Sequence, residues 1–171
     1  MDFYDLVKSR SSIRTFQRDR PIPEEVLHRV LEAGRMAPSA CNLQPWRILV
    51  VRTPAMLEKI YPCYQRPWIQ EAPCLLIVTG ESKNAWVRQK DGYNSIETDL
   101  GIVMDHLVLA AASEGLGTCW IAAFDKEMLK QALGMREEEE LFAFTPLGYP
   151  APNSPPMPKS RKPLEEIVRF L

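Results

Sequence analysis

The chain has 171 residues, of which 46% are apolar and 25% are charged, as in an ordinary globular protein that forms one domain without structural metal or disulfides. Its 21 basic and 22 acidic residues leave a net charge of −1, which argues against a general nucleic-acid binder. No apolar run approaches the roughly 20 residues of a membrane span, and the first residues lack the basic start and apolar core of a signal peptide.

The N-terminal half of the chain predicts three helices and two strands. The expected helices cover residues 2–9, 21–34 and 53–60, and the expected strands cover residues 46–52 and 74–79. Prolines and acids mark the first turn of the second helix, and Gly34 is placed to end it. The apolar run 74–79 is continuous, which is typical of a strand covered on both faces.

The C-terminal half predicts a long helix followed by shorter elements. The expected helices cover residues 93–114, 125–134 and 163–171, and the expected strands cover residues 118–122 and 141–148. The 93–114 helix repeats apolar residues at helical spacing over a length of roughly 33 Å. Residues 150–162 are too rich in proline for a helix or a central strand, so they form an extended arm. The mixture predicts a single domain of the α/β or α+β class.

Cysteine and histidine residues are few and scattered. Four cysteines and two histidines form neither a C-x-x-C pair nor a cluster with zinc-ligand spacing, so no metal site is expected. The cysteines are expected to be reduced, cytoplasmic thiols that pack as small apolar residues. His106 falls on the polar side of the long helix, where a structural role is expected.

Two basic segments carry residues suited to an anion. Residues 10–14 read Arg-Ser-Ser-Ile-Arg, and guanidinium forks with hydroxyls between them match phosphate oxygens. The same arginine spacing also suits a solvated helix face. Residues 158–162 read Pro-Lys-Ser-Arg-Lys at the end of the proline-rich arm, which is compatible with a solvated tail or with a phosphate clamp.

A third segment, residues 38–46, combines small residues with amides just before a strand. Small residues let a flat ligand approach the backbone, while an ordinary turn with Trp46 in the core explains the same pattern. The chain contains no dinucleotide fingerprint G-x-G-x-x-G, no phosphate-binding G-x-x-x-x-G-K-[ST] and no G-x-S-x-G. If the protein is an enzyme, a cofactor is therefore expected to carry the difficult step.

Six motifs recur in a characteristic order over essentially the whole chain. They are Arg10-Ser11-Ser12-x-Arg14-x-Phe16, Pro38-Ser39-x-x-Asn42-x-Gln44-Pro45-Trp46, Asp99-Leu100-Gly101, Gly115-Leu116-Gly117-Thr118-Cys119-Trp120-Ile121, Pro146-Leu147-Gly148-Tyr149-Pro150 and Pro158-Lys159-Ser160-Arg161. Together they resemble the nitroreductase family of FMN-dependent NAD(P)H oxidoreductases.

The resemblance implies an α+β, nitroreductase-like fold in which helices wrap a mainly antiparallel sheet. Residues 1–171 would form a single FMN-binding domain, and two copies would intertwine as a homodimer around the long helix. Residues 150–171 would be a C-terminal arm that reaches the partner subunit and adds an edge strand to its sheet. Each FMN site would be built from both chains.

The resemblance also implies site residues. Arg10 and Ser12, with Ser11 adjacent, resemble ligands of the FMN phosphate and ribityl chain, Lys159 and Arg161 resemble a distal phosphate clamp, and Arg14 resembles the cation near flavin N1 and O2. Pro38, Ser39, Ala40, Asn42 and Gln44 resemble the loop beside the ring, and Ile121 and Ala122 resemble a partner-side segment whose backbone N–H groups face flavin N5 and O4. No side chain is expected to act as catalytic acid or base.

The implied activity is a ping-pong hydride transfer through flavin N5 from NADH or NADPH to a nitroaromatic, quinone or similar small-molecule acceptor. The chain departs from the family at Ala122 and Ala123, where glycine is frequent, and it lacks room for the lid insertion of longer members. An open acceptor pocket is therefore expected. The alternatives are a specialised flavin dehydrogenase or dehalogenase of one metabolite, and a flavin-binding module without turnover.

Overall fold

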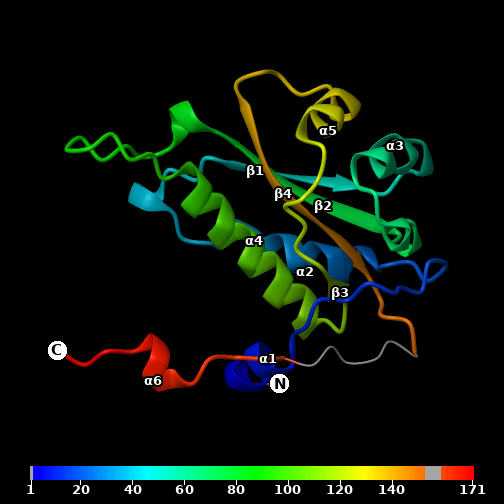
Figure 1. Ribbon diagram of the computed structural model, residues 1–171. Helices are drawn as coiled ribbons and strands as arrows, with labels where there is room; N and C mark the ends of the chain where they lie inside the picture. The colour runs from blue at the N-terminus through cyan, green and yellow to red at the C-terminus, as the bar shows by residue number, and fades with distance from the viewer. Residues whose placement is uncertain (1, 153–158) are drawn as a thin grey trace.

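A four-stranded antiparallel sheet in the order β1-β2-β4-β3 forms the centre of the molecule in this computed structural model, which describes residues 2–152 and 159–171 (Figure 1). The strands are β1 (Trp46–Val51), β2 (Cys74–Glu81), β3 (Gly117–Thr118) and β4 (Glu139–Gly148). The helices are α1 (Phe3–Ser9), α2 (Glu24–Arg35), α3 (Pro54–Ile60), α4 (Ile96–Ser113), α5 (Lys126–Leu133) and α6 (Leu164–Ile167). The predicted α+β class with an antiparallel sheet is confirmed.

Strand β2 is the centre of the core and is buried along its whole length. Its side chains alternate between the two faces of the sheet. Leu76 and Val78 join the apolar cluster beneath α2 and α4, whereas Leu75 and Ile77 join the cluster beneath α3 and α5. Helices therefore cover both faces, as the continuous apolar run predicts.

Helix α4 is shorter than the sequence predicts, with 18 residues and a length of about 27 Å. The residues before it form a turn, in which the Asn94 side chain accepts a hydrogen bond from the Ile96 N–H at 2.9 Å. Helix α2 continues through Gly34 instead of ending there. A Cβ at Gly34 would lie 2.7 Å from Leu107 of α4, so the glycine permits close approach of the two helices and does not mark a helix end.

The elements around α5 follow local signals only in part. Asp125 caps α5 by accepting a hydrogen bond from the Met128 N–H at 2.9 Å, and Gly134 ends it with φ 63°, as predicted. The predicted strand 118–122 is reduced to β3 and a single bridge between Ile121 and Phe144. The final helix is one turn, α6, since Val168 returns to extended backbone.

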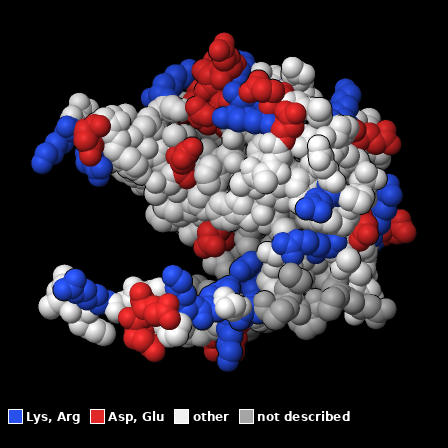
Figure 2. All heavy atoms as spheres, in the orientation of Figure 1, with Lys and Arg blue, Asp and Glu red and all other residues white. Residues whose placement is uncertain are grey.

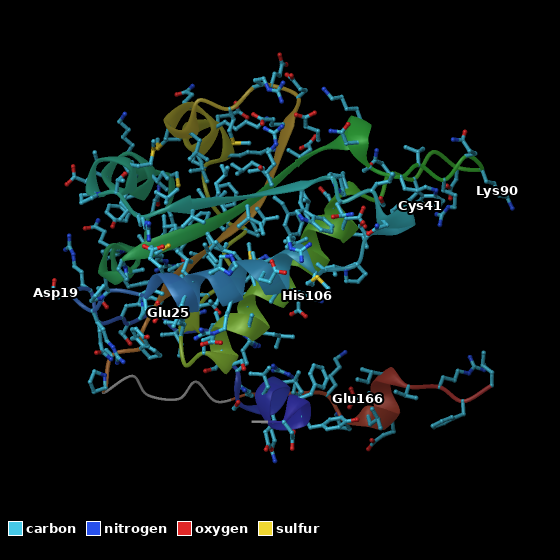
Figure 3. The ribbon with its side chains drawn as sticks, turned by 180° about the vertical axis from the view of Figure 1, so that it is seen from behind. Asp19, Glu25, Cys41, Lys90, His106 and Glu166 are labelled. Atoms are coloured by element: carbon cyan, nitrogen blue, oxygen red, sulfur yellow. The ribbon has the colours of Figure 1, made fainter. Side chains whose placement is uncertain are left out.

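The terminal helices α1 and α6 are neighbours (Figure 1), and α1 also contacts α4. Figures 1 and 3 show α1 and α6 side by side below the sheet, and Figure 2 shows a notch between this region and the body. Phe3 and Tyr4 of α1 and Leu164, Ile167 and Phe170 are all exposed. Within residues 2–152 and 159–171, no helix is long and apolar enough to cross a membrane. The proline-rich residues 153–158 of the predicted arm lie outside the described residues.

Candidate cofactor site

The segment after α1 runs alongside β3. Ser12 pairs with Thr118 as a parallel bridge, and the Ile13 N–H donates to the Thr118 carbonyl at 2.8 Å. Gly117 makes this contact possible, since a Cβ there would lie 2.8 Å from the Cβ of Ile13. Residues 12–14 and 117–119 of one chain therefore form one wall.

The Cys119 thiol is buried in this wall, beside Ser12 and Arg14. Burial raises the pKa of Cys119, while the charge of Arg14, hydrogen bonds with the Ser12 and Arg14 side chains and the charge of Arg10 act to lower it. The sequence predicts Cys119 only as a packing residue and gives no signal for this contact. The Arg14 guanidinium is available to a ligand because it is exposed and forms no ion pair within the described part of the chain.

A cluster of three cations lies next to this wall. Lys159 donates from Nζ to the carbonyl of Lys8 near the end of α1. Partial desolvation lowers the pKa of Lys159, and the positive charges of Arg10 and Arg161 lower it further. In residues 2–152 and 159–171 no carboxylate pairs with Arg10, Lys159 or Arg161. Figure 2 shows basic side chains gathered over α1 and the adjoining C-terminal segment. Mutual repulsion without a counter-charge indicates an anion site.

The loop 38–44 contains three residues that depart from ordinary backbone geometry. Cys41, Asn42 and Gln44 have φ values of 51°, 56° and 50°, which lie in the left-handed region that disfavours side chains. The Ser39 hydroxyl accepts a hydrogen bond from the Gln44 N–H at 3.0 Å, and Gln44 in turn donates to the Asn42 carbonyl at 3.1 Å. Pro38 is exposed at the start of the loop. Such strain persists only where surrounding contacts impose it, and it concentrates at functional sites.

Asp99 in the first turn of α4 supplies one of those contacts. Its Oδ1 accepts a hydrogen bond from the Ala40 N–H at 3.0 Å, and its Oδ2 accepts one from the Ser95 hydroxyl at 2.7 Å. Asp99 and Ser95 are only 2% and 3% exposed. Asp99-Leu100-Gly101 is one of the six motifs that resemble the family, but the sequence alone assigns no role to the Asp99 carboxylate.

The structure keeps the loop 38–44 away from the wall and the cation cluster of the same chain. The loop is attached to the first turn of α4, whereas Ser12 is attached to β3, just beyond the other end of α4. Most of the helix length, about 20 Å, separates the two attachments. Figures 1 and 3 show the same separation, with Cys41 far from α1. One chain thus carries two incomplete halves of a site.

The backbone N–H groups of Ile121 and Ala122 differ in their hydrogen bonding. The 117–122 segment begins at β3, which pairs with Ser12, so it lies beside Ser12 and Arg14 of the same chain. The Ile121 N–H donates to the Phe144 carbonyl at 2.9 Å, so it is committed to the sheet and cannot face a flavin. Ala122 is exposed, and its N–H has no partner in the part of the chain that the structure describes.

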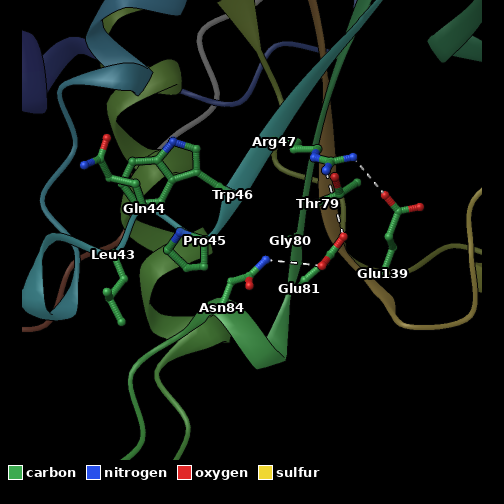
Figure 4. Close-up of a pocket in the computed structure, with 10 residues that line it drawn as sticks. All are labelled: Leu43, Gln44, Pro45, Trp46, Arg47, Thr79, Gly80, Glu81, Asn84 and Glu139. Carbon is green, nitrogen blue, oxygen red and sulfur yellow. Dashed lines mark hydrogen bonds and ion pairs between the residues drawn. The ribbon is translucent and has the colours of Figure 1, made fainter.

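Two cavities adjoin these halves. One, of about 420 Å³, borders Gln44 of the loop, and in it Arg47 lies between Glu81 and Glu139 at 3.9 and 3.4 Å (Figure 4). Its charges are therefore paired with one another. The other, of about 640 Å³, borders Ala123, next to Ala122. Among the described residues, no group of histidine, cysteine and acidic side chains is arranged to hold a metal ion.

Comparison with known proteins assigns the chain to a family. The Nitroreductase family profile matches residues 7–66 and 59–149, which include the segments 10–14, 38–44 and 117–122 but not Lys159 or Arg161. The chain belongs to this family. The nitroreductase-like fold expected from the motifs is confirmed by a solved structure of a nitroreductase family protein from Clostridium difficile. That structure is 31% identical, covers 99% of this chain and 98% of its own, and superposes with a TM-score of 0.90.

Other relatives carry related descriptions. A protein of Methanothermobacter thermautotrophicus named NADH dehydrogenase/NAD(P)H nitroreductase is 34% identical over 90% of this chain and 80% of its own length. A nitroreductase of Desulfovibrio desulfuricans, solved in complex with FMN, is 26% identical over 98% of this chain and 95% of its own, with a TM-score of 0.84. An iodotyrosine deiodinase of Thermotoga neapolitana is 26% identical over 98% and 96% of the two chains.

Proposed function

We propose that the protein is an FMN-dependent NAD(P)H oxidoreductase that reduces nitroaromatic, quinone or similar small acceptors in the cytoplasm. The observation that carries this proposal is the cation cluster of Arg10, Lys159 and Arg161 beside the wall that contains Ser12 and Arg14. The NAD(P)H nitroreductase and FMN-bound relatives support the same activity. All four cysteines are unpaired, which suits a reducing compartment.

The side chains of this site fit FMN. The three clustered cations suit the terminal phosphate, Ser12 suits a ribityl hydroxyl, and Arg14 is placed two residues beyond the bridge that joins the two wall segments. When bound, FMN supplies two-electron chemistry that no side chain of the chain offers. Arg14 would stabilise negative charge on a flavin ring held beside it, and the exposed Ala122 N–H would be free to donate a hydrogen bond to that ring.

The two separated halves support a homodimer. A second copy would bring its loop 38–44 to the wall and cation cluster of the first, so that each FMN touches both chains. The exposed apolar residues Leu164, Ile167 and Phe170 would be covered at the same time, with residues 150–171 acting as the arm that reaches the partner. This arrangement completes a site that one chain leaves open.

The proposal is tested on the purified protein. We expect a yellow protein that releases FMN on heating, identified by chromatography against FMN and FAD standards. Anaerobic NADH or NADPH should bleach the colour, and a nitroaromatic or quinone should restore it. Release of FAD alone would contradict the FMN assignment. A yellow protein that neither nucleotide bleaches would instead indicate a flavin-binding module without turnover.

The iodotyrosine deiodinase relative supports a second candidate, the reductive dehalogenation of one aromatic metabolite at the same site. In that reaction the electron pair of the reduced cofactor and a proton replace the carbon–halogen bond with carbon–hydrogen and release halide. Mixing the bleached protein with a halogenated phenol distinguishes the two candidates. Halide release at a rate that exceeds nitroaromatic reduction would favour the dehalogenase.

A further inference from the structure

The cavity of about 640 Å³ beyond Ala122 is large enough for a small one-ring ligand. Its walls come from two segments that are far apart in the sequence. One contributes Pro62, Tyr64 and Arg66, and the other contributes Phe124, Asp125 and Met128. The Asp125 N–H donates to the Cys63 carbonyl at 2.8 Å and holds the two walls together. The cavity is thus a built feature of the fold.

Tyr64 connects this cavity to the wall of the candidate cofactor site. Burial raises the pKa of the Tyr64 phenol, and its neighbour Cys119 acts in the same direction, whereas the charges of Arg14 and Arg66 oppose the rise. Tyr64 therefore lies within electrostatic reach of Arg14, Cys119 and Arg66. Its ring packs edge-on against Phe144 of β4, with centroids 6.1 Å apart, which holds it in place.

The lining of the cavity carries one cation, Arg66, and one carboxylate, Asp125. Arg66 is exposed, and no carboxylate within residues 2–152 or 159–171 forms an ion pair with it. Arg14, which acts on Tyr64 from outside this lining, also forms no ion pair among the described residues. The single carboxylate of the lining, Asp125, already uses one oxygen to cap α5. Phe124 and Met128 supply apolar surface opposite the charges.

We propose that this cavity binds the electron acceptor and selects planar acceptors that carry a carboxylate or similar anionic group, which Arg66 binds. This inference rests on the proposed oxidoreductase function and adds the chemical class of the acceptor. The apolar side chains pack against the ring, and the guanidinium of Arg66 forms charge-assisted hydrogen bonds with the anionic group. Asp125 opposes the same group and limits its affinity.

The test uses two redox-inert probes of the same shape, benzoate and neutral benzamide, titrated into the FMN-loaded protein. Calorimetry and the shift of the flavin absorbance report binding without turnover. We expect benzoate to bind at least about tenfold more tightly than benzamide. Arg66→Gln should weaken benzoate binding by about 10- to 150-fold and leave benzamide binding unchanged.

Two further variants provide matched controls. Arg18→Gln removes the same charge from an exposed arginine outside this cavity, and should leave benzoate binding unchanged. Asp125→Asn keeps the helix cap while removing the opposing charge, so it should tighten benzoate binding a few-fold. Binding is compared only between proteins whose FMN content and unfolding temperature match those of the parent protein.

The outcomes separate this inference from the proposed function. Equal affinity for benzoate and benzamide, or an Arg66→Gln variant that binds benzoate as well as the parent protein, overturns the acceptor class even if NAD(P)H bleaches the flavin. A protein that never carries FMN, but shows the benzoate preference and its loss in Arg66→Gln, overturns the proposed function and leaves the anionic-ligand site in place.

Discussion

Arg10 and Arg14 are four residues apart, yet they lie in different surroundings. Arg10 is part of the cation cluster with Lys159 and Arg161, whereas Arg14 lies against Cys119 in the wall. Arg10→Ala should therefore weaken FMN binding by about 10- to 150-fold with little change in the flavin midpoint potential. Arg14→Ala should lower that potential, by about 30 mV for each ~1.4 kcal/mol of lost stabilisation of the reduced state. Flavin-binding and redox titrations of both variants measure this difference, and equal potential changes would contradict it.

The buried carboxylate of Asp99 holds the strained loop by its backbone. Asp99→Ala leaves the Ala40 N–H and the Ser95 hydroxyl without their partner, so the free energy of unfolding should fall by about 1–3 kcal/mol. FMN binding should weaken as well, since the loop loses its attachment. Asp99→Asn retains an acceptor for Ala40 and should recover most of both properties. Urea unfolding and flavin titration measure the series, and equal behaviour of the two variants would argue against this role.

Because of Lys159, we expect the affinity for FMN to fall as the pH becomes alkaline. The pKa of Lys159 is lowered in the free protein by desolvation and by Arg10 and Arg161, and a bound phosphate would raise it again. Affinity is therefore highest below the lowered pKa and falls as the pH rises through it, beginning below the usual lysine range. Flavin titrations over the alkaline range should show this fall in the parent protein and in Lys162→Gln. Its persistence in Lys159→Gln would exclude Lys159 as the cause.

At the scale of elements, the wall depends on close packing between β3 and the segment after α1. Gly117→Ala places a Cβ 2.8 Å from the Cβ of Ile13, which should cost about 1–3 kcal/mol of unfolding free energy and weaken FMN binding. Combining it with Ile13→Ala removes two of the three clashing atoms, so the double variant should recover part of the FMN affinity. Unfolding curves and flavin titrations check both variants. Simple addition of the two losses would show that the contact is not responsible.

Local signals account for the elements that the sequence predicts well. The continuous apolar run gives β2, and the Asp125 cap with Gly134 gives α5, because these patterns act within a few residues. Gly34 misleads since its role is tertiary: it admits Leu107 and does not end a helix. The 118–122 segment has strand-like residues, but pairing with β4 is limited to β3 and one bridge.

In the candidate site, too, some residues are predicted from local motifs and others are placed only by long-range contacts. The basic segment 10–14 and the loop 38–44 are recognisable from short motifs, although whether they meet within one chain is not a property of either motif. Tyr64 and Arg66 carry no local signal. Their relation to Arg14 comes from long-range contacts alone. The Ser12–Thr118 bridge, which places the Ile121 segment beside Ser12 and Arg14 of its own chain, is likewise a long-range contact that neither motif predicts.

At the scale of the whole molecule, the C-terminal segment supplies Lys159 and Arg161 of the cation cluster and several exposed apolar residues. Deleting residues 151–171 should therefore reduce both FMN content and dimer stability, with FMN affinity falling more than about 100-fold. Light scattering after size-exclusion chromatography and the flavin-to-protein absorbance ratio measure the two effects. A truncated protein that stays dimeric with full flavin content would contradict the role of the arm and leave α4 as the interface.

The placement of the two half-sites at opposite ends of α4 links flavin supply to assembly. If each FMN touches both chains, FMN strengthens subunit association by the same factor by which association strengthens FMN binding. Dilution then releases flavin, and flavin shortage releases monomers. The unfolding temperature of the protein then rises with the protein concentration and with the FMN concentration. In the proposed dimer, chains that lack FMN would associate more weakly and would leave Leu164, Ile167 and Phe170 uncovered.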